Sequence, residues 1–426
     1  MTPCSPWPSR TYAGPGAPRP AHTSVVASCR ARRKAAHVAA THPPRESLHA
    51  GYSAHCPPPG FGDIIVVPIL DAYTVVQYMN VVTPLISRWR SLDIRFDAYA
   101  PQLWSAALSA CCAQSPATHV PFIRELTLIY PGNDDTREFV LFNGSAPRLR
   151  RVTLCGIRLS WTRSLFQDLA YLDYTHHGFT RGQDAAAEVL AMLRVSSHLH
   201  ELRLSFPWRG DSHSVSPHSV PLTVVLPRLL TLVLTVEGPE IPNAFLTVLA
   251  HVSCPALRTL RLYSTYPFLR PSLFPRLRHV SRVLPPLPAL EVLHIEHGWL
   301  DPRFIFPLLL SLPRLRHLTL KGVRVTGPFL VGLAENLSAR RAHTSLASRL
   351  KVLEVIGCDL LGADVVQAFR LKPGWSRHGI ETILIRDCPG VGPTAIGKLG
   401  GLGMDVTIWP AGGRGESGTQ RKVLYR

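Results

Sequence analysis

The chain has 426 residues, of which 46% are hydrophobic and 17% charged, and this composition excludes a wholly disordered protein. Its formal net charge is +18, and residues 1–60 and 411–426 supply +6 and +3 of that total. A basic balance favours acidic partners without identifying them. The nine cysteines include no CxxC spacing, which argues against a disulfide framework or a zinc site. We therefore expect a cytoplasmic or nuclear protein.

The amino-terminal segment, residues 1–60, contains eleven prolines and few large aliphatic residues, so we expect it to be disordered. Its basic run RARRK (30–34) resembles a nuclear import signal or a nucleic-acid contact. Because aromatic residues are not interleaved with this run, we do not expect nucleic-acid binding. The apolar run IIVVPIL (64–70) is shorter than the roughly 18 residues that span a bilayer, so we expect no membrane insertion.

An amphipathic helix is predicted over residues 71–88, DAYTVVQYMNVVTPLISR, with a bend at Pro84. We expect it to cap the amino-terminal end of a repeat domain that covers residues 61–410. MDVTIWP (404–410) alternates apolar and polar residues and is expected to be a closing strand. Residues 411–426 are expected to form a disordered tail.

The repeat domain is recognised from a recurring pattern of apolar residues. In LRHLTLKGVRV (315–325) they occupy positions 1, 4, 6, 9 and 11. Successive copies start 20 to 35 residues apart, and the pattern is typical of the leucine-rich repeat, whose period is about 20–29 residues. The eleven copies start at Trp89, Ile123, Leu149, Leu169, Leu199, Leu229, Leu257, Leu290, Leu315, Leu350 and Ile380.

The spacing has a physical explanation. Positions 4 and 6 lie on the same side of a short strand because strands have a period of two, and positions 1, 9 and 11 line the same core. RGQDAAAEVLAMLRVSS (181–197) is rich in helix formers and predicts a helical return. Stacked repeats bury one continuous core. The sequence thus predicts an α/β leucine-rich-repeat solenoid (horseshoe) of about 10–11 repeats, with a parallel concave β-sheet, a mostly helical convex side and insertions at 207–221 and 336–349.

Positions 3, 5 and 7 of each copy are expected to point out of the concave sheet toward a protein partner. This face mixes both charges with aromatic residues, and Tyr and Arg are frequent binding anchors. The sixth copy offers only Thr231, Val233 and Thr235, which an apolar partner side chain could cover. The candidate partner-binding residues are Tyr171, Asp173, Arg203, Phe206, Arg261, Tyr263, His294, Glu296, His317 and Lys321.

No stretch of the sequence carries a complete catalytic or metal-binding pattern. GPTAIGKL (392–399) matches the start of a phosphate-binding loop, but Leu399 stands where that loop needs Ser or Thr. DYTHH (173–177) holds two histidines that we expect to point to opposite sides of a strand and to bind no metal. Cys358 and Cys388 occupy position 9 of their repeats and are interpreted as structural. We therefore expect no enzymatic activity, catalytic residue, cofactor or metal.

Cysteine at position 9, in VIGCDL and LIRDCPGVG, resembles the cysteine-containing repeats of F-box proteins. LISRWRSLDIRF (85–96), LRRVTLCGIRLSW (149–161) and LAYLDYTHHGFTRGQ (169–183) are similar to the large F-box-like family of mushroom-forming (basidiomycete) fungi. The resemblance covers about residues 64–409. In that family an F-box docks on the adaptor of an SCF ubiquitin ligase, and the repeats hold a substrate.

The F-box itself is not detectable, because the usual LP-x-E-x-L-x-x-I helix and the W-R helix after it are missing before residue 85. The resemblance implies a non-enzymatic substrate-binding component of an SCF-type ubiquitin ligase, with the adaptor and cullin as further partners. The alternative is a truncated leucine-rich-repeat scaffold or decoy that binds a protein without recruiting a ligase.

Overall fold

The computed structural model describes most of the predicted repeat region together with short strands outside it. Residues 392–399, which match the start of a phosphate-binding loop, lie outside the described residues. So do nearly all residues of the two predicted insertions. The described residues are 23–29, 62–65, 72–96, 99–112, 120–207, 223–237, 241–265, 286–296, 299, 302–323, 325–326, 328–330, 332–333, 350–358, 381–391, 405–409 and 423–425.

These residues form a mixed α/β structure built on one large sheet. Each of the eleven predicted copies supplies one strand, and these strands pair in chain order, all parallel, in a single sheet. The prediction of an α/β fold with a large parallel sheet is confirmed. The strands are β3 (Ser91–Phe96), β4 (Glu125–Ile129), β5 (Arg151–Cys155), β6 (Tyr171–Thr175), β7 (Glu201–Phe206), β9 (Thr231–Val236), β11 (Thr259–Ser264), β12 (Val292–Glu296), β13 (His317–Lys321), β14 (Val352–Ile356) and β15 (Thr382–Arg386).

Further strands extend this sheet at both ends. β16 (Asp405–Trp409), within the predicted closing strand, pairs in parallel with β15, and β17 (Val423–Tyr425) then pairs antiparallel with β16. At the other end β1 (Thr23–Cys29) pairs antiparallel with both β3 and β2 (Gly62–Ile65). Residues 23–29 and 423–425, which belong to the segments expected to be disordered, form these end strands.

The core follows the repeat pattern. In all eleven copies the side chains at positions 4 and 6 are buried, as are those at position 1 of every copy whose first residue is described. Paired strands are aligned position on position, so that Leu293 lies opposite Leu318 and Leu318 opposite Leu353. Because side chains alternate along a strand, this register buries one face of every strand and leaves positions 3, 5 and 7 on the other.

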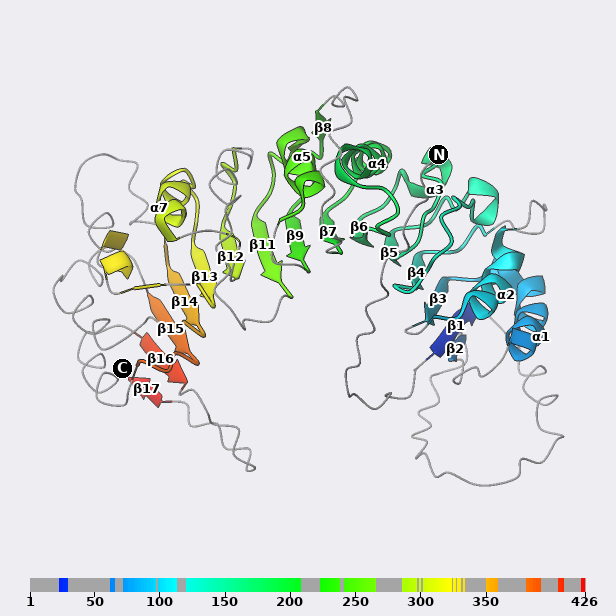
Figure 1. Ribbon diagram of the computed structural model, residues 1–426, viewed down its shortest axis with the longest axis horizontal. Helices are drawn as coiled ribbons and strands as arrows, with labels where there is room; N and C mark the ends of the chain where they lie inside the picture. Colours follow the sequence, from blue (N-terminus) through cyan, green and yellow to red (C-terminus); the bar gives the residue numbers. More distant parts are fainter. Residues whose placement is uncertain are drawn as a thin grey trace, which may run out of the picture.

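Helices return the chain between strands. Figure 1 shows the strands along the inner side of an arc and the helices along its outer side. A 3-10 helix, Thr83–Arg88, follows α1 (Ala72–Val82) within the predicted capping segment and has Pro84 in its first turn. The described helices are α1 (Ala72–Val82), α2 (Pro101–Cys112), α3 (Arg163–Phe166), α4 (Gly182–Val195), α5 (Asn243–His251) and α7 (Pro302–Leu310). Among the described residues, none of these helices combines the length and the apolar character needed to cross a bilayer.

Candidate binding face

The candidate site is the inner face of the arc, formed by positions 3, 5 and 7 of the repeat strands. At position 5 the residues from β6 to β14 lie side by side in one row. Neighbouring strands are about 4.8 Å apart, so a partner that lies along the row meets a new side chain at that interval. The row consists of Asp173, Arg203, Val233, Arg261, His294, Thr319 and Glu354.

The first half of this face is centred on Tyr171, whose ring lies between two arginines. The Arg151 guanidinium is 4.1 Å from the ring centroid and that of Arg203 is 5.6 Å from it. Arg203 also forms an ion pair with Glu201 at 2.8 Å. Cation–π contacts and the ion pair fix the orientation of three long side chains before any partner arrives, so less conformational entropy is lost on binding.

Asp173 lies next to this cluster and accepts a hydrogen bond from the Tyr171 hydroxyl at 3.3 Å. Burial raises the pKa of Asp173, and the opposing effect of the Arg203 charge does not cancel the rise. Burial also raises the pKa of Tyr171. The carboxyl group is thus partly shielded from water, and a partner that donates a hydrogen bond to it would cover little additional polar surface.

The middle of the face is less open than the sequence suggests. Thr231 and Thr235 are half-buried, but Val233 is only 5% exposed even though it lies in the position-5 row. The predicted apolar patch is therefore a nearly closed part of the sheet surface between Arg203 and Arg261.

The second half of the face begins with Arg261, which is exposed and has no carboxylate partner among the described residues. The Tyr263 ring packs against the His294 ring at a centroid distance of 4.9 Å. The indole N–H of the buried Trp299 donates to the Tyr263 carbonyl oxygen at 2.6 Å, which holds the end of β11. Tyr263 and His294 form a fixed platform beside a guanidinium that is available to a partner.

Glu296 joins three elements at the end of this platform. Its carboxylate accepts hydrogen bonds from Lys321 Nζ at 2.7 Å and from the Ser264 backbone N–H at 3.1 Å, and it contacts His294 Nε2 at 3.4 Å. Burial acts to raise the pKa of Glu296, but these three contacts outweigh it and lower the pKa to about 2. The predicted site residue Glu296 is accordingly buried, and Lys321 presents the more exposed side chain of the pair.

The remaining predicted residue of this half, His317, lies beside Glu354 at 3.7 Å. Glu354 also pairs with Arg386 at 3.4 Å, and it accepts a hydrogen bond from Thr319 at 3.2 Å. Of the ten predicted residues, the structure thus brings nine to this face, in two groups separated by β9. Sequence reasoning missed Arg151 and Glu354, although both occupy face positions of their copies.

Phe206 is the exception, and its predicted place on the face is wrong. β7 continues one residue beyond position 7, so the alternation turns Phe206 inward, and it is only 4% exposed. Its ring stacks on His176 at 5.1 Å and packs against Phe245 at 5.0 Å. Phe206 stabilises the interior and is not available to a partner.

The two adjacent histidines also differ from the prediction, since both are buried and their rings lie 4.3 Å apart. β6 ends at Thr175, so strand alternation no longer applies to them. His176, His177 and Glu188 each place one potential ligand atom within 4.8 Å of the others, a geometry that could hold a metal ion.

The hydrogen bonds around the rings argue against that use. Each Nδ1 faces a backbone N–H, from Gly178 for His176 and from Phe179 for His177, both at 3.0 Å. A neutral imidazole whose Nδ1 accepts a hydrogen bond carries its proton on Nε2. A nitrogen that carries a proton has no lone pair for a metal ion.

The Nε2 atoms serve a polar network instead. His177 Nε2 donates to Glu188 at 2.7 Å, while His176 Nε2 contacts Thr180, which donates to Glu188 at 2.9 Å. Burial acts to raise the pKa of Glu188, but the hydrogen bond from His177 and the other donors lower it. The cluster therefore ties the segment after β6 to α4.

Cys358 and Cys388 are buried in adjacent repeats. The Cys358 N–H donates to Cys388 Sγ at 3.4 Å, and each thiol contacts a carbonyl oxygen of the preceding repeat at 3.9 Å. Their contacts fit the structural role that was predicted for them.

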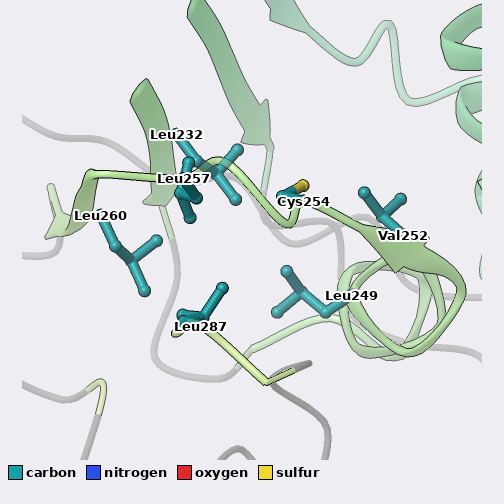
Figure 2. Close-up of a pocket in the computed structure, with 7 residues that line it drawn as sticks. All are labelled: Leu232, Leu249, Val252, Cys254, Leu257, Leu260 and Leu287. Atoms are coloured by element: carbon teal, nitrogen blue, oxygen red, sulfur yellow. The ribbon is translucent and has the colours of Figure 1, made fainter. Parts of the chain in front are cut away.

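A small cavity behind β9 and β11 offers no ligand site. Its volume is about 10 Å³, room for at most one water molecule, and Figure 2 shows that only apolar side chains and one cysteine surround it. A water there would find no hydrogen-bond partner. The lining residues are Leu232, Leu249, Val252, Cys254, Leu257, Leu260 and Leu287.

Comparison with known proteins identifies no relative by sequence: no known protein family and no curated protein matches the chain. Among solved structures, one match is the crystal structure of a TLR13–ssRNA13 complex, with 14% sequence identity and a TM-score of 0.28. The match covers 63% of this chain and 40% of that chain, so this chain spans less than half of its length. A likeness this weak carries no argument about fold or function.

Proposed function

We propose that the chain is a leucine-rich-repeat solenoid that recognises a protein partner on its inner face and has no enzymatic activity of its own. The regular pattern supports the repeat assignment, because every described residue at positions 1, 4 and 6 is buried and every copy supplies one strand. Parallel strands in unbroken chain order are the arrangement that stacked repeats produce. The cysteine usage supports a location in the cytoplasm or nucleus.

The observation that carries the recognition role is the arrangement on the inner face. Two rigid aromatic groups, Tyr171 between its arginines and Tyr263 against His294, present large side chains that are already held in place. Arg261 stands between them without an acidic partner among the described residues. Preorganised Tyr and Arg side chains near the centre of a surface are typical of binding hot spots.

The likeness to F-box-like repeat proteins supports a narrower proposal. The chain would hold a substrate for an SCF-type ubiquitin ligase, with its adaptor and cullin as additional partners. The lack of a recognisable F-box in the sequence favours a second candidate, a scaffold or decoy that binds the partner without a ligase. Both candidates use the same inner face, so they differ only in whether an adaptor is recruited.

Affinity purification of the tagged full-length chain from a fungal host distinguishes the two. The ligase proposal predicts that the SCF adaptor and the cullin co-purify in stoichiometric amounts, both with the unaltered chain and with a variant that disrupts the inner face. Recovery of other proteins without adaptor or cullin would leave the scaffold as the function. Recovery of no protein that depends on the inner face would contradict both.

A further inference from the structure

Basic residues also gather outside the inner face, along the edge of the sheet where the strands begin. The residue at position 2 of each copy precedes its strand, and its backbone N–H bonds to the carbonyl of position 2 in the copy before. In this ladder the Arg124 N–H donates to the Arg90 carbonyl at 2.7 Å, and that of Arg150 to the Arg124 carbonyl at 2.9 Å. Three arginines are therefore direct neighbours on adjacent repeats.

Two more arginines lie beside this stack, each in the residue before position 1. Arg88 precedes the copy of β3 and Arg148 that of β5, and Phe122 holds the corresponding place between them. All five arginines are exposed, and Phe122 is 46% exposed although it is a large apolar side chain. We call Arg88, Arg90, Arg124, Arg148, Arg150 and Phe122 the arginine patch. Its arginines are spread from residue 88 to residue 150, so no basic run in the sequence reveals it.

The charge of the patch is only partly balanced. On the inner face several acidic and basic residues pair, as in Asp93–Arg95 at 2.8 Å and Glu296–Lys321 at 2.7 Å. Within the patch, Arg150 lies 3.6 Å from Asp168, but Arg88, Arg124 and Arg148 have no ion pair with any described residue. Like charges held close together repel one another, so folding does not explain this arrangement.

Phe122 indicates the chemistry of the ligand. The Arg148 guanidinium lies over its ring at 5.1 Å from the centroid. A positively charged surface with an exposed aromatic ring in its middle provides contacts for phosphates together with a platform for a base. Acidic side chains of a peptide would pair with the arginines but would not stack on the ring.

The exposed ring favours a single strand over a duplex. Unpaired bases can stack on the Phe122 ring, whereas the bases of a duplex are already stacked on one another. We propose that the arginine patch binds a single-stranded nucleic acid, with its arginines on successive phosphates and Phe122 stacked on a base. This site is separate from the inner face and does not depend on the function proposed for that face.

The test measures binding of a fluorescent uridine RNA of about eight nucleotides to the full-length chain over a range of salt concentrations. Two variants probe the patch: Arg124→Gln with Arg148→Gln, and Phe122→Ala. The matched control, Arg258→Gln with Arg316→Gln, removes the same charge from two exposed arginines at position 2 of other copies. Thermal unfolding confirms that all variants fold.

The patch double variant should bind about tenfold more weakly, and the slope of log Kd against log salt should fall by about 1.4, which is about 0.7 for each lost phosphate contact. Phe122→Ala should lose about fivefold in affinity, with an unchanged salt slope, because stacking is not ionic. The control double should stay within about twofold of the unaltered chain.

Three results would overturn the proposal. An equal loss in the control would mean that charge anywhere on this edge, and not the patch, attracts the RNA. Full binding by Phe122→Ala, with equally strong competition by poly-glutamate or by phosphatidylserine vesicles, would indicate an acidic protein segment or a membrane surface instead. Equal affinity for a duplex of the same length would exclude a site built for a single strand.

Discussion

At the scale of single residues, Glu296 shows how the inner face is held in shape. Its carboxylate is buried, yet it stays ionised because a lysine, a histidine and a backbone N–H all contact it. Removing one partner of such a group leaves a buried charge or donor without compensation, which costs more than the pair contributes when intact.

The pH dependence of stability should reflect this carboxylate. Its pKa is lowered from 4.5 to about 2 in the folded state, so its contribution is complete above pH 4.5 and disappears as the pH falls toward 2. Glu296→Gln should therefore be less stable at neutral pH and lose less stability than the unaltered chain between these two pH values. Urea unfolding at a series of pH values measures both effects.

Glu381→Gln is the matched control, because Glu381 also pairs with a lysine, Lys351, but the pair is exposed. An exposed ion pair contributes little to stability, so this variant should follow the unaltered chain. The account of Glu296 is wrong if both variants show the same pH dependence.

Leu318 tests the register of the repeats at the same scale. It occupies position 4 of its copy and is completely buried, between Leu293 and Leu353 on the neighbouring strands. Leu318→Ala should lower the free energy of unfolding by about 2–5 kcal/mol, the usual loss for a truncated core leucine. Leu230→Ala, at an exposed leucine, should change it by less than about 0.5 kcal/mol. A loss below about 1 kcal/mol for Leu318→Ala would mean that the assigned register is incorrect.

At the scale of elements, the turns after the strands decide how closely the repeats approach. Gly156 follows β5 with a φ of +73°, and a Cβ at this position would overlap the Tyr130 carbonyl oxygen. Gly357 follows β14 with a φ of +59°, but a Cβ there would meet no atom within 4 Å. Alanine would therefore meet backbone strain at both positions, but a steric clash only at Gly156.

Alanine substitution at these glycines should give two different costs. Gly357→Ala should destabilise by about 1–2 kcal/mol, the penalty of a left-handed conformation for a residue with a side chain. Gly156→Ala should lose clearly more, because β4 and β5 must also move apart. Chemical denaturation of the two variants measures the difference, and equal losses would show that the close approach at Gly156 has no energetic importance.

The repeat strands could be predicted from the sequence because every copy carries several leucines or other apolar residues at fixed positions. Leucines such as Leu202 and Leu204 recur in the same places of each copy, and a period of two leaves one way to bury them. The prediction failed where strands end. His176 lies just beyond β6, and Phe206 is the final residue of β7. The repeat pattern does not predict whether a strand ends one residue earlier or later.

Contacts between side chains of different copies could not be predicted from the sequence either. Glu296 is buried because Lys321 and Ser264 come from the neighbouring strands, and Arg90 and Arg124 become neighbours only when the copies stack. Residues of different repeats that share a position are brought together by the fold. Their chemistry can be compared only after the register is known.

At the scale of the whole molecule, the arc separates two kinds of surface. On the inner face most charges pair with one another, and the rigid groups around Tyr171 and Tyr263 suit a folded partner. At the edge where the strands begin, Arg88, Arg124 and Arg148 have no ion pair with any described residue. Because each repeat contributes one residue to each position, a change in one copy alters the surface locally and leaves distant copies intact.

If the inner face holds the partner, the affinity of paired variants should show it. The protein that co-purifies with the full-length chain is titrated against Arg261→Glu with Tyr263→Ala. Its control is Arg314→Glu with Leu310→Ala, the same kinds of change at two exposed residues outside the inner face. We expect the inner-face pair to lose at least about 2 kcal/mol of binding free energy at an almost unchanged Tm, while the control binds normally. Normal binding by the inner-face pair, or an equal loss in the control, would mean that the partner does not bind through Arg261 and Tyr263.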